Sequence, residues 1–375
     1  MVLKIYKNKR SAFDMGEQDW KEWLLAQGLK PFIAKQIMQW IFKHHITEPQ
    51  RFSNLSLSVR EELQNQFDWT LLKLDTLLKS QDGSEKFLFK THDHSLIESV
   101  LMPTNNRVTL CVSSQIGCKM GCTFCQTAKM GFGRNLSSGE ILSQLIVANL
   151  HLASTGKECR VTNVVFMGMG EPLDNYLEVV KSCHIMIDNH YFNLAQRRVT
   201  VSTSGLVPEI RQMAHDLPVS LAISLHSTKD QERSSMMPIN KKYSLQQLKE
   251  ALLYYQKNSG RDITFEYVMI DEKNDSIDHA KQLVKFIHGL KASVNLIPMN
   301  PHPGSPFKAS TLDRLKAFQK YLQDRSYPAP IRYSKAQDVS GACGQLASKR
   351  SHELALTPQE VAKVRRAERR LVAAP

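Results

Sequence analysis

The sequence predicts an α/β fold built on a parallel sheet, because short β-branched runs alternate with longer helical patterns along most of the chain. This alternation is typical of parallel strands whose connecting helices cover the sheet, either as a barrel or as a doubly wound sheet. Ligands of such sheets bind at the carboxyl ends of the strands. The expected strands are 163–167, 198–202, 219–224, 264–269, 294–298 and a weaker 330–333, and the expected helices are 138–153, 176–188, 207–214, 244–256, 276–289 and 311–323.

The region before this alternation divides into a helical part and a β-rich part. Residues 17–68 predict three short helices, with a break at Gly28–Pro31 and with Ser58 capping the third. The β-rich runs are 86–90, 96–102 and 107–113. We therefore expect a helical module at 1–70, a β-rich connection at 71–106, a core at 107–347 and a basic tail at 348–375. The module is either an RNA-binding element or a plain helical cap, and the tail is interpreted as a solvated face rather than an RNA contact.

Composition favours a cytosolic protein that meets a polyanion. The 375 residues include 49 Lys and Arg against 36 Asp and Glu, a net charge of +13. Such a balance favours nucleic acid over a membrane as the partner. No apolar run approaches the roughly 18 residues of a membrane span, and the first ten residues lack a signal-peptide core. Seven cysteines in such a chain predict catalysis or metal binding rather than a disulfide framework.

Three of those cysteines lie within eight residues, as Cys118-x3-Cys122-x2-Cys125. A loop this short brings its thiolates together at little entropic cost. A structural zinc ion needs four ligands, which Cys111 could complete. An iron–sulfur cube that is held by only three thiolates leaves one iron open for another ligand. Spacing alone leaves both interpretations open.

The spacing resembles the cluster motif of radical S-adenosylmethionine enzymes, and the segments around it narrow the resemblance to the RlmN/Cfr family of RNA adenine methyltransferases. These segments are Cys111–Cys118, Phe166–Pro172, Val199–Gly205, Ala222–His226, Met237–Tyr243, Asn295–Pro301 and Gly341–Leu346. The resemblance runs from about residue 15 to 347 and is stronger to the RlmN branch. It implies a partial (β/α)6 TIM-type barrel with an N-terminal helical accessory domain.

The resemblance also implies the cofactors and the residues that bind them. One [4Fe–4S] cluster would be held by Cys118, Cys122 and Cys125. S-adenosylmethionine would be bound by Gly170, Glu171, Ser202, Ser224, Leu225, His226 and Asn300. Without the family resemblance, Ser202 and Ser224 would be interpreted as turn residues at strand ends, and His226 as a structural imidazole. The glycines before Glu171 would let the backbone approach a ligand.

Three further residues receive chemical roles through the resemblance. Cys343 would carry the methyl group as S-methylcysteine and join it to the adenine carbon. Cys111 would release the product by forming a transient disulfide with Cys343, as in thiol–disulfide exchange. Glu98 would accept a proton. Cys159 and Cys183 match no functional position and are interpreted as structural.

The expected activity is methylation of C2 of adenosine in 23S rRNA, with tRNA as a second candidate substrate. The alternatives are methylation of C8, as in the Cfr branch, and a zinc-stabilised RNA-binding protein without catalysis. A monomer that receives electrons from a flavodoxin or ferredoxin is expected. One departure concerns residues 335–339, where Lys-Ala-Gln-Asp-Val replaces the family's usual Arg-Gly-Asp-Asp-Ile. This change affects the expected substrate range more than the chemistry.

Overall fold

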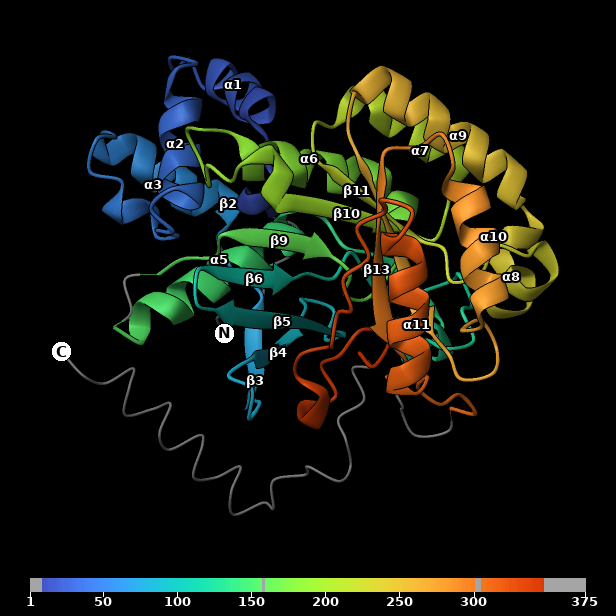
Figure 1. Ribbon diagram of the computed structural model, residues 1–375. Coiled ribbons are helices and arrows are strands. Elements are labelled where there is room, and N and C mark those ends of the chain that lie inside the picture. Colours follow the sequence, from blue (N-terminus) through green and yellow to red (C-terminus); the bar gives the residue numbers. More distant parts are fainter. Residues whose placement is uncertain (1–8, 157–158, 301–304, 347–375) are drawn as a thin grey trace.

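The computed structural model describes residues 9–156, 159–300 and 305–346. Its centre is a nine-stranded sheet in the order β13-β12-β11-β10-β9-β6-β5-β4-β3 (Figure 1). The strands are β3 (Lys73–Lys79), β4 (Glu85–Lys90), β5 (Leu96–Thr104), β6 (Arg107–Cys111), β9 (Asn163–Phe166), β10 (Val199–Thr203), β11 (Ser220–Ser224), β12 (Ile263–Met269) and β13 (Ala292–Pro298). The predicted α/β class is confirmed.

The six strands β6 and β9 to β13 pair with one another in parallel throughout. Helices connect them and lie outside the sheet: α5 (Ser138–Ser154), α6 (Tyr176–Ile187), α7 (Val207–Asp216), α8 (Asp230–Met236), α9 (Leu245–Ser259) and α10 (Ile277–Ile287), with α11 (Leu312–Gln323) after the last strand. Figure 1 shows β13 steeply inclined to β6 and β9, so the sheet is strongly curved. These features fit the expected partial barrel of six β/α units. All six strands end at the same edge.

The strands β3, β4 and β5 extend this sheet in antiparallel fashion. One face of β4 carries Phe87 and Phe89, both fully buried. The alternate residues of β4, which include Lys86, point to the opposite face. The 71–106 region is therefore β-rich and hydrogen-bonded to the core sheet, while the expected domain boundaries stay a prediction.

The N-terminal module contains the three predicted helices, α1 (Glu17–Ala26), α2 (Ile33–Phe42) and α3 (Leu57–Gln66). Its core includes the fully buried Trp20, which stacks on Trp69 with ring centroids 6.2 Å apart. The predicted cap of the third helix is wrong. Ser56, not Ser58, accepts the Val59 amide, because its extended backbone directs the hydroxyl at the first free amides of the helix.

Two further expectations need correction or extension. Residues 330–333 do not form a strand, since only Ile331 makes a bridge, to Leu296 of β13. The hairpin of β7 (Gln115–Gly117) and β8 (Phe132–Asn135) was not predicted, because its strands are too short to show alternation. The basic tail from residue 348 lies outside the described residues. Within those residues, none of the helices has the length and apolar content that a membrane span requires.

Candidate active site

A cavity of about 160 Å³ opens at the carboxyl ends of the parallel strands and collects ten of the thirteen residues singled out from the sequence. These ten are Cys118, Cys122, Cys125, Gly170, Glu171, Ser202, Ser224, His226, Asn300 and Cys343. A larger hollow of about 860 Å³ lies elsewhere, at the opposite strand ends, and is lined by Arg107, Arg197, Arg198 and Lys335 among others. Because the smaller cavity alone gathers thiols and strand-end polar groups, it is the candidate active site.

The cluster loop, residues 118–131, supplies three of these thiols and is closed by the β7–β8 hairpin. The Cys118 amide donates to the Gly131 carbonyl at 3.0 Å, and the Thr123 amide donates to Met236 at 2.9 Å. Gly117 has a φ of 71°, and a Cβ there would lie 1.8 Å from the Gly131 oxygen. Only glycine permits so close a crossing of the two strands. The short spacing of the cysteines therefore produces a loop that is tied at its base.

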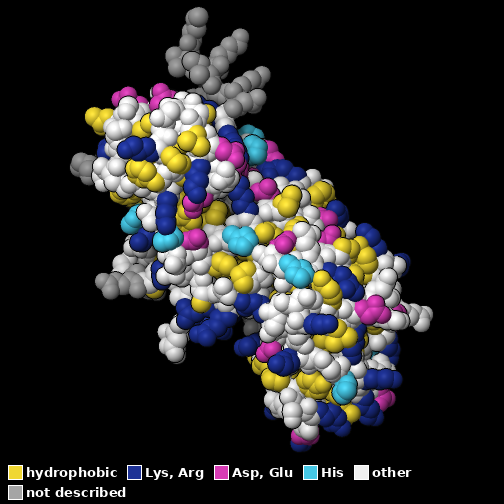
Figure 2. Space-filling view, turned by 90° about the horizontal axis from the view of Figure 1, so that it is seen from above, with side chains coloured by type: hydrophobic (Ala, Val, Ile, Leu, Met, Phe, Trp, Pro, Cys, Tyr) yellow, Lys and Arg dark blue, Asp and Glu magenta, His cyan; other side chains and the backbone are white. Residues whose placement is uncertain are grey.

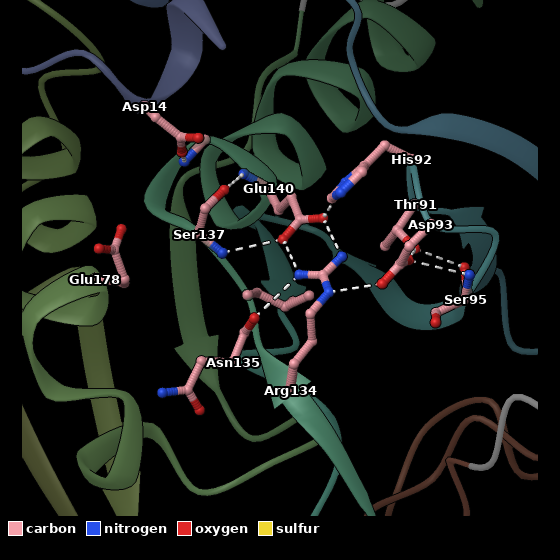
Figure 3. Close-up of polar contacts among 12 residues, drawn as sticks. Asp14, Thr91, His92, Asp93, Ser95, Arg134, Asn135, Ser137, Glu140 and Glu178 are labelled. Carbon is pink, nitrogen blue, oxygen red and sulfur yellow. Dashed lines mark hydrogen bonds and ion pairs between the residues drawn. The ribbon is translucent and has the colours of Figure 1, made fainter. Parts of the chain in front are cut away.

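Arg134 of β8 fastens the hairpin to its surroundings (Figure 3). Its guanidinium donates to both oxygens of Glu140 at 2.7 and 2.8 Å, and to Asp93 at 2.8 Å. Figure 3 shows the two carboxylates on separate elements, the start of α5 and the turn after β4. A bidentate pair of this kind fixes orientation as well as distance. The hairpin beneath the cluster loop is thus held to a helix and to the sheet extension.

The three thiols lie near one another in a desolvated setting. Burial raises the pKa of Cys118 to about 12, and neighbouring acidic groups, Glu171 and Cys125, add to the shift. Burial, and next Cys125 and Cys118, raise the pKa of Cys122. Metal coordination deprotonates such thiols outright.

The arrangement differs from a mononuclear metal site. Among the described residues, no three His, Cys, Asp or Glu side chains converge on one metal-ion position. Zinc would draw its sulfurs to about 2.3 Å from a single centre. A cube presents its irons at separate corners, which suits three thiols from one loop around a cavity. Cys118, Cys122 and Cys125 line the cavity and Cys111 does not, so the residues fit a set of three thiol ligands better than a zinc site that Cys111 completes.

Gly170 and Glu171 form the floor of the cavity after β9. Gly170 has a φ of 102°, and a Cβ there would lie 2.5 Å from the Gln115 Cβ. The Glu171 carboxylate accepts the Leu173 amide at 3.1 Å and the Ser204 amide at 2.7 Å. Burial raises the pKa of Glu171, while these bonds oppose the rise. A carboxylate so fixed keeps further lone pairs for a cationic or hydroxyl ligand.

Ser202, the penultimate residue of β10, and Ser224, the last residue of the neighbouring β11, line the cavity. Behind them lies Arg233, which is buried and donates to the carbonyls of Ser224 at 3.1 Å and Leu225 at 3.1 Å. Leu225 itself is fully buried in the hydrophobic core, and its side chain is not part of the cavity lining. Any contact of Leu225 with a ligand would involve its backbone.

His226 lines the cavity as a neutral imidazole. Its Nδ1 accepts the Val268 amide at 3.0 Å, which leaves the proton on Nε2. Burial, and secondarily Arg233, lowers the pKa of His226 to about 3. Its φ of 60° is left-handed, and Asn274 holds its carbonyl at 2.7 Å. The ring also meets Phe124 of the cluster loop edge-on, with centroids 4.8 Å apart.

Cys343 reaches the same cavity from the far end of the chain, on the Cys343 loop (residues 334–346). Asn300 donates to the Cys343 carbonyl at 3.1 Å, and the Gln126 amide donates to Gly344 at 2.7 Å. The Cys343 residue keeps exposed surface although protein crowds its thiol. Desolvation, and next the carboxyl of Glu266, raises its pKa to about 11. Asn300 therefore tethers this loop in the structure.

Cys111 and Glu98 lie beside the cavity rather than in its lining. Cys111 is the last residue of β6. Its pKa is raised first by burial and next by the charge of a Cys343 thiolate, so the two thiols are close enough to interact electrostatically. All seven cysteines are free thiols in this structure. Glu98 on β5 is buried and forms an ion pair with Lys86 at 3.2 Å. These positions are compatible with the expected roles, which stay predictions.

Sequence reasoning missed two buried charged residues of the site, Glu266 and Arg233. Glu266 of β12 lines the cavity and accepts from Asn295 at 2.8 Å. Burial raises its pKa to about 7. A lone acidic residue within the otherwise uncharged strand Ile263–Met269 was the available signal. Arg233 gave no such signal, since a basic residue on a short helix is normally exposed.

The cluster loop at the mouth of a β/α partial barrel defines a class, and comparison with known proteins agrees with it. The Radical SAM superfamily model matches residues 112–287, and the model of the ribosomal RNA large subunit methyltransferase N-terminal domain matches residues 12–68. A crystal structure of a radical SAM methyltransferase from Sphaerobacter thermophilus superimposes with a TM-score of 0.85 at 39% identity, covering 91% of this chain and all of the other. This chain is a radical S-adenosylmethionine enzyme.

Curated relatives narrow the class to a family. Proteins named dual-specificity RNA methyltransferase RlmN are similar to this chain, with 40% identity over 344 residues in Ruthia magnifica subsp. Calyptogena magnifica and 43% over 343 residues in a Nitratiruptor species. The alignments cover 91% and 88% of this chain and 96% of each relative. The chain therefore belongs to the RlmN family of radical S-adenosylmethionine RNA methyltransferases.

Proposed function

We propose that this protein methylates C2 of adenosine in 23S rRNA and in tRNA, with Cys343 as the carrier of the methyl group. One observation carries the proposal: the fold brings Cys343 into the cavity that holds Cys118, Cys122 and Cys125, and within electrostatic reach of Cys111. The names of the relatives support RNA of two kinds as substrate.

The cavity fits the cofactors of the proposed reaction. Cys118, Cys122 and Cys125 would hold a [4Fe–4S] cluster, and the fixed carboxylate of Glu171 would bind S-adenosylmethionine through its amino or ribose groups. When bound, the pair supplies a methyl group and a 5′-deoxyadenosyl radical. Gly170, Ser202, Ser224, His226 and the Leu225 backbone would complete the binding site, and Asn300 would link it to the Cys343 loop.

The remaining chemistry falls to three side chains. The Cys343 Sγ takes up the methyl group, one hydrogen atom of which would pass to the 5′-deoxyadenosyl radical. The resulting carbon radical bonds to C2 of adenine, and the unpaired electron of the adduct would return to the cluster. Glu98 accepts the proton that leaves C2, provided that it comes within hydrogen-bond reach of the adduct. The Cys111 Sγ then attacks the Cys343 Sγ, which breaks the bond from sulfur to carbon and forms a disulfide, and the released carbon keeps the bonding electron pair and takes up a proton to become the methyl group of the product. The buried Cys111 thiol must lose its proton for that step, since thiolate is the nucleophile.

The surface of the protein supports an RNA substrate. The net charge is +13, and Figure 2 shows Lys and Arg side chains distributed widely over the face seen from above. We infer that the N-terminal helical module contributes to RNA binding, since a family-specific N-terminal domain model matches it. A cytoplasmic monomer that receives its electrons from a flavodoxin or ferredoxin completes the proposal.

Nucleoside mass spectrometry tests the proposal most directly. Anaerobically reconstituted protein would be incubated with S-adenosylmethionine, a reductant and either 23S rRNA fragments or tRNA that lack the modification. We expect 2-methyladenosine from both RNAs. Formation of 8-methyladenosine would replace the proposal with Cfr-like chemistry, and methylation of one RNA alone would reduce the substrate range.

Metal analysis separates the enzyme from a binding protein. We expect brown protein with about four irons per chain, held by three thiolates. A colourless protein with one zinc ion and no S-adenosylmethionine cleavage would instead favour a zinc-stabilised RNA-binding protein.

A further inference from the structure

A row of residues crosses three strands beside the cavity and ends at Cys111. Lys86 of β4 pairs directly with Val100 of β5, and Val100 pairs with Cys111 of β6. Side chains of directly paired residues point to the same face of a sheet. Glu98, two residues before Val100, shares that face. One face of the sheet therefore presents Lys86, Glu98 and Cys111 together.

Lys86 makes two polar contacts from this row. Its Nζ lies 3.2 Å from the Glu98 Oε1 and donates to the Ser340 carbonyl at 3.3 Å. The side chains of Lys86 and Glu98 are only 9% and 3% exposed. A buried ion pair is weak evidence of stabilisation, because desolvation offsets most of its attraction, and removal of one partner leaves a buried charge without compensation. A role beyond stability accounts better for such a pair.

The second contact joins the row to the Cys343 loop, because Ser340 precedes Cys343 by three residues. The loop packs directly over the row. A Cβ on Gly341 would lie 2.8 Å from the Ala336 Cβ and 3.4 Å from the Val100 Cγ2. Ser340 has a left-handed φ of 52°, which an L-residue adopts only when surrounding contacts hold it. The Lys86 ammonium is a contact that holds this residue.

We propose that Lys86 is a positioning residue for the methyl transfer. Its single ammonium group holds both the Cys343 loop and the Glu98 carboxylate in place. This inference rests on the proposed function. Through its bond to the Ser340 carbonyl, the Lys86 Nζ fixes the position of the Cys343 loop over the row that ends at Cys111. Through its ion pair, the same atom fixes the orientation of the Glu98 carboxylate. Loss of the Nζ would release the methyl carrier and the proton acceptor together.

Matched variants of one strand test this. Lys86→Met removes the ammonium and keeps an unbranched side chain, Lys86→Arg keeps a charged donor, and Lys90→Met makes the same change on the same face of β4, four residues away. Two measurements are made. The first is methyl transfer together with the 5′-deoxyadenosine formed per methyl group. The second is the rate at which iodoacetamide alkylates Cys343 in cluster-free protein.

For Lys86→Met we expect methyl transfer to fall at least tenfold and the ratio of 5′-deoxyadenosine to methyl groups to rise, because the radical forms while its acceptor is misplaced. Cys343 alkylation should be several-fold faster than in wild type. Lys86→Arg should restore most of both values, and Lys90→Met should match wild type. Lys86→Gln takes the place of Lys86→Met if the latter does not fold.

Equal behaviour of the Lys86→Met and Lys90→Met proteins in both measurements would overturn the inference. The inference would also be overturned if Lys86→Arg lost as much methyl transfer as Lys86→Met and showed the same drop in melting temperature. That outcome would indicate a structural role only. A wild-type protein that transfers no methyl group refutes the proposed function instead. The alkylation comparison still decides in that case whether Lys86 holds the loop.

Discussion

The two loops that meet at the cavity are held in different ways. The cluster loop is closed by backbone hydrogen bonds of the β7–β8 hairpin and by the bidentate Arg134 clamp. The Cys343 loop contains one 3-10 turn, Gln337–Val339, and its outer contacts are largely single side chains. Asp338 accepts from the Ser80 hydroxyl at 2.5 Å, and Lys86 and Asn300 each donate to one loop carbonyl.

This difference matches the tasks proposed for the loops. Cluster ligands must keep a fixed spacing, which a hairpin held by backbone bonds provides. The methyl-carrying side chain must lie first beside the cofactor and then beside Cys111. It therefore needs a segment that can shift when a few contacts break. The retained acid of the altered 335–339 segment, Asp338, is one of those contacts, so the segment keeps its attachment to the sheet despite its changed sequence.

The largest expected effect is the loss of activity when one cysteine of either the cluster loop or the Cys343 loop is replaced. Cys122→Ala should abolish both S-adenosylmethionine cleavage and methyl transfer, because the cluster loses a ligand. Cys343→Ala should abolish methyl transfer while iron content and the cluster absorbance persist. Iron assay, absorbance spectra and product analysis distinguish the two. Loss of iron in the Cys343→Ala protein would mean that the loops do not have separate roles.

Cys111→Ala should stop turnover at a later stage. Without the attacking sulfur, the bond between Cys343 and the RNA carbon persists, so a protein–RNA cross-link should accumulate. Denaturing gels of reactions with labelled RNA would show the shifted band. Cys183→Ala is the control, since Cys183 is also buried but lies in α6 and does not line the cavity. Uncross-linked product at the wild-type rate would remove Cys111 from the mechanism.

Two glycine substitutions test the rigidity of the cavity floor. Gly170→Ala should lower the free energy of unfolding by about 2–4 kcal/mol and abolish cofactor binding, because φ is 102° and the new Cβ meets Gln115 at 2.5 Å. Gly260→Ala, with φ of 67° and open space around it, should cost about 1–2 kcal/mol from backbone strain alone. Denaturant unfolding measures both. Equal losses would show that the floor accommodates the methyl group.

The last expected effect is a pH dependence of stability at Glu266, which lines the cavity together with Cys343. Burial raises its pKa to about 7, so the folded state binds a proton more tightly than the unfolded state. This contribution to stability is complete below about pH 4.3, the ordinary glutamate pKa, and is lost as pH rises towards 7. The unfolding free energy of wild type minus that of Glu266→Gln should therefore decline between pH 4.5 and 7.5. A difference that stays flat would mean an ionised Glu266 at every pH tested.

Sequence patterns predicted most of the fold and most of the site for separate reasons. Long alternating segments such as 163–298 carry periodicity that survives without tertiary context. The site residues were assigned through the resemblance of their surrounding motifs to a known family, and most of these motifs follow predicted strands. The short β7–β8 hairpin, the absent 330–333 strand and the Ser56 cap depend on pairing and local geometry that no short window contains. Glu266 and Arg233 were missed because burial, not identity, makes them part of the site.

The sequence by itself determined the α/β class, the three-cysteine loop and the family, because these rest on periodicity and on spacing within short segments. Tertiary structure decided which distant segments meet. Only the sheet register sets Lys86, Val100 and Cys111 in one row, and only the packing of residues 334–346 on that row brings Cys343 to the cluster loop. Contacts between residues more than two hundred positions apart depend on the assembled sheet, which local sequence does not encode.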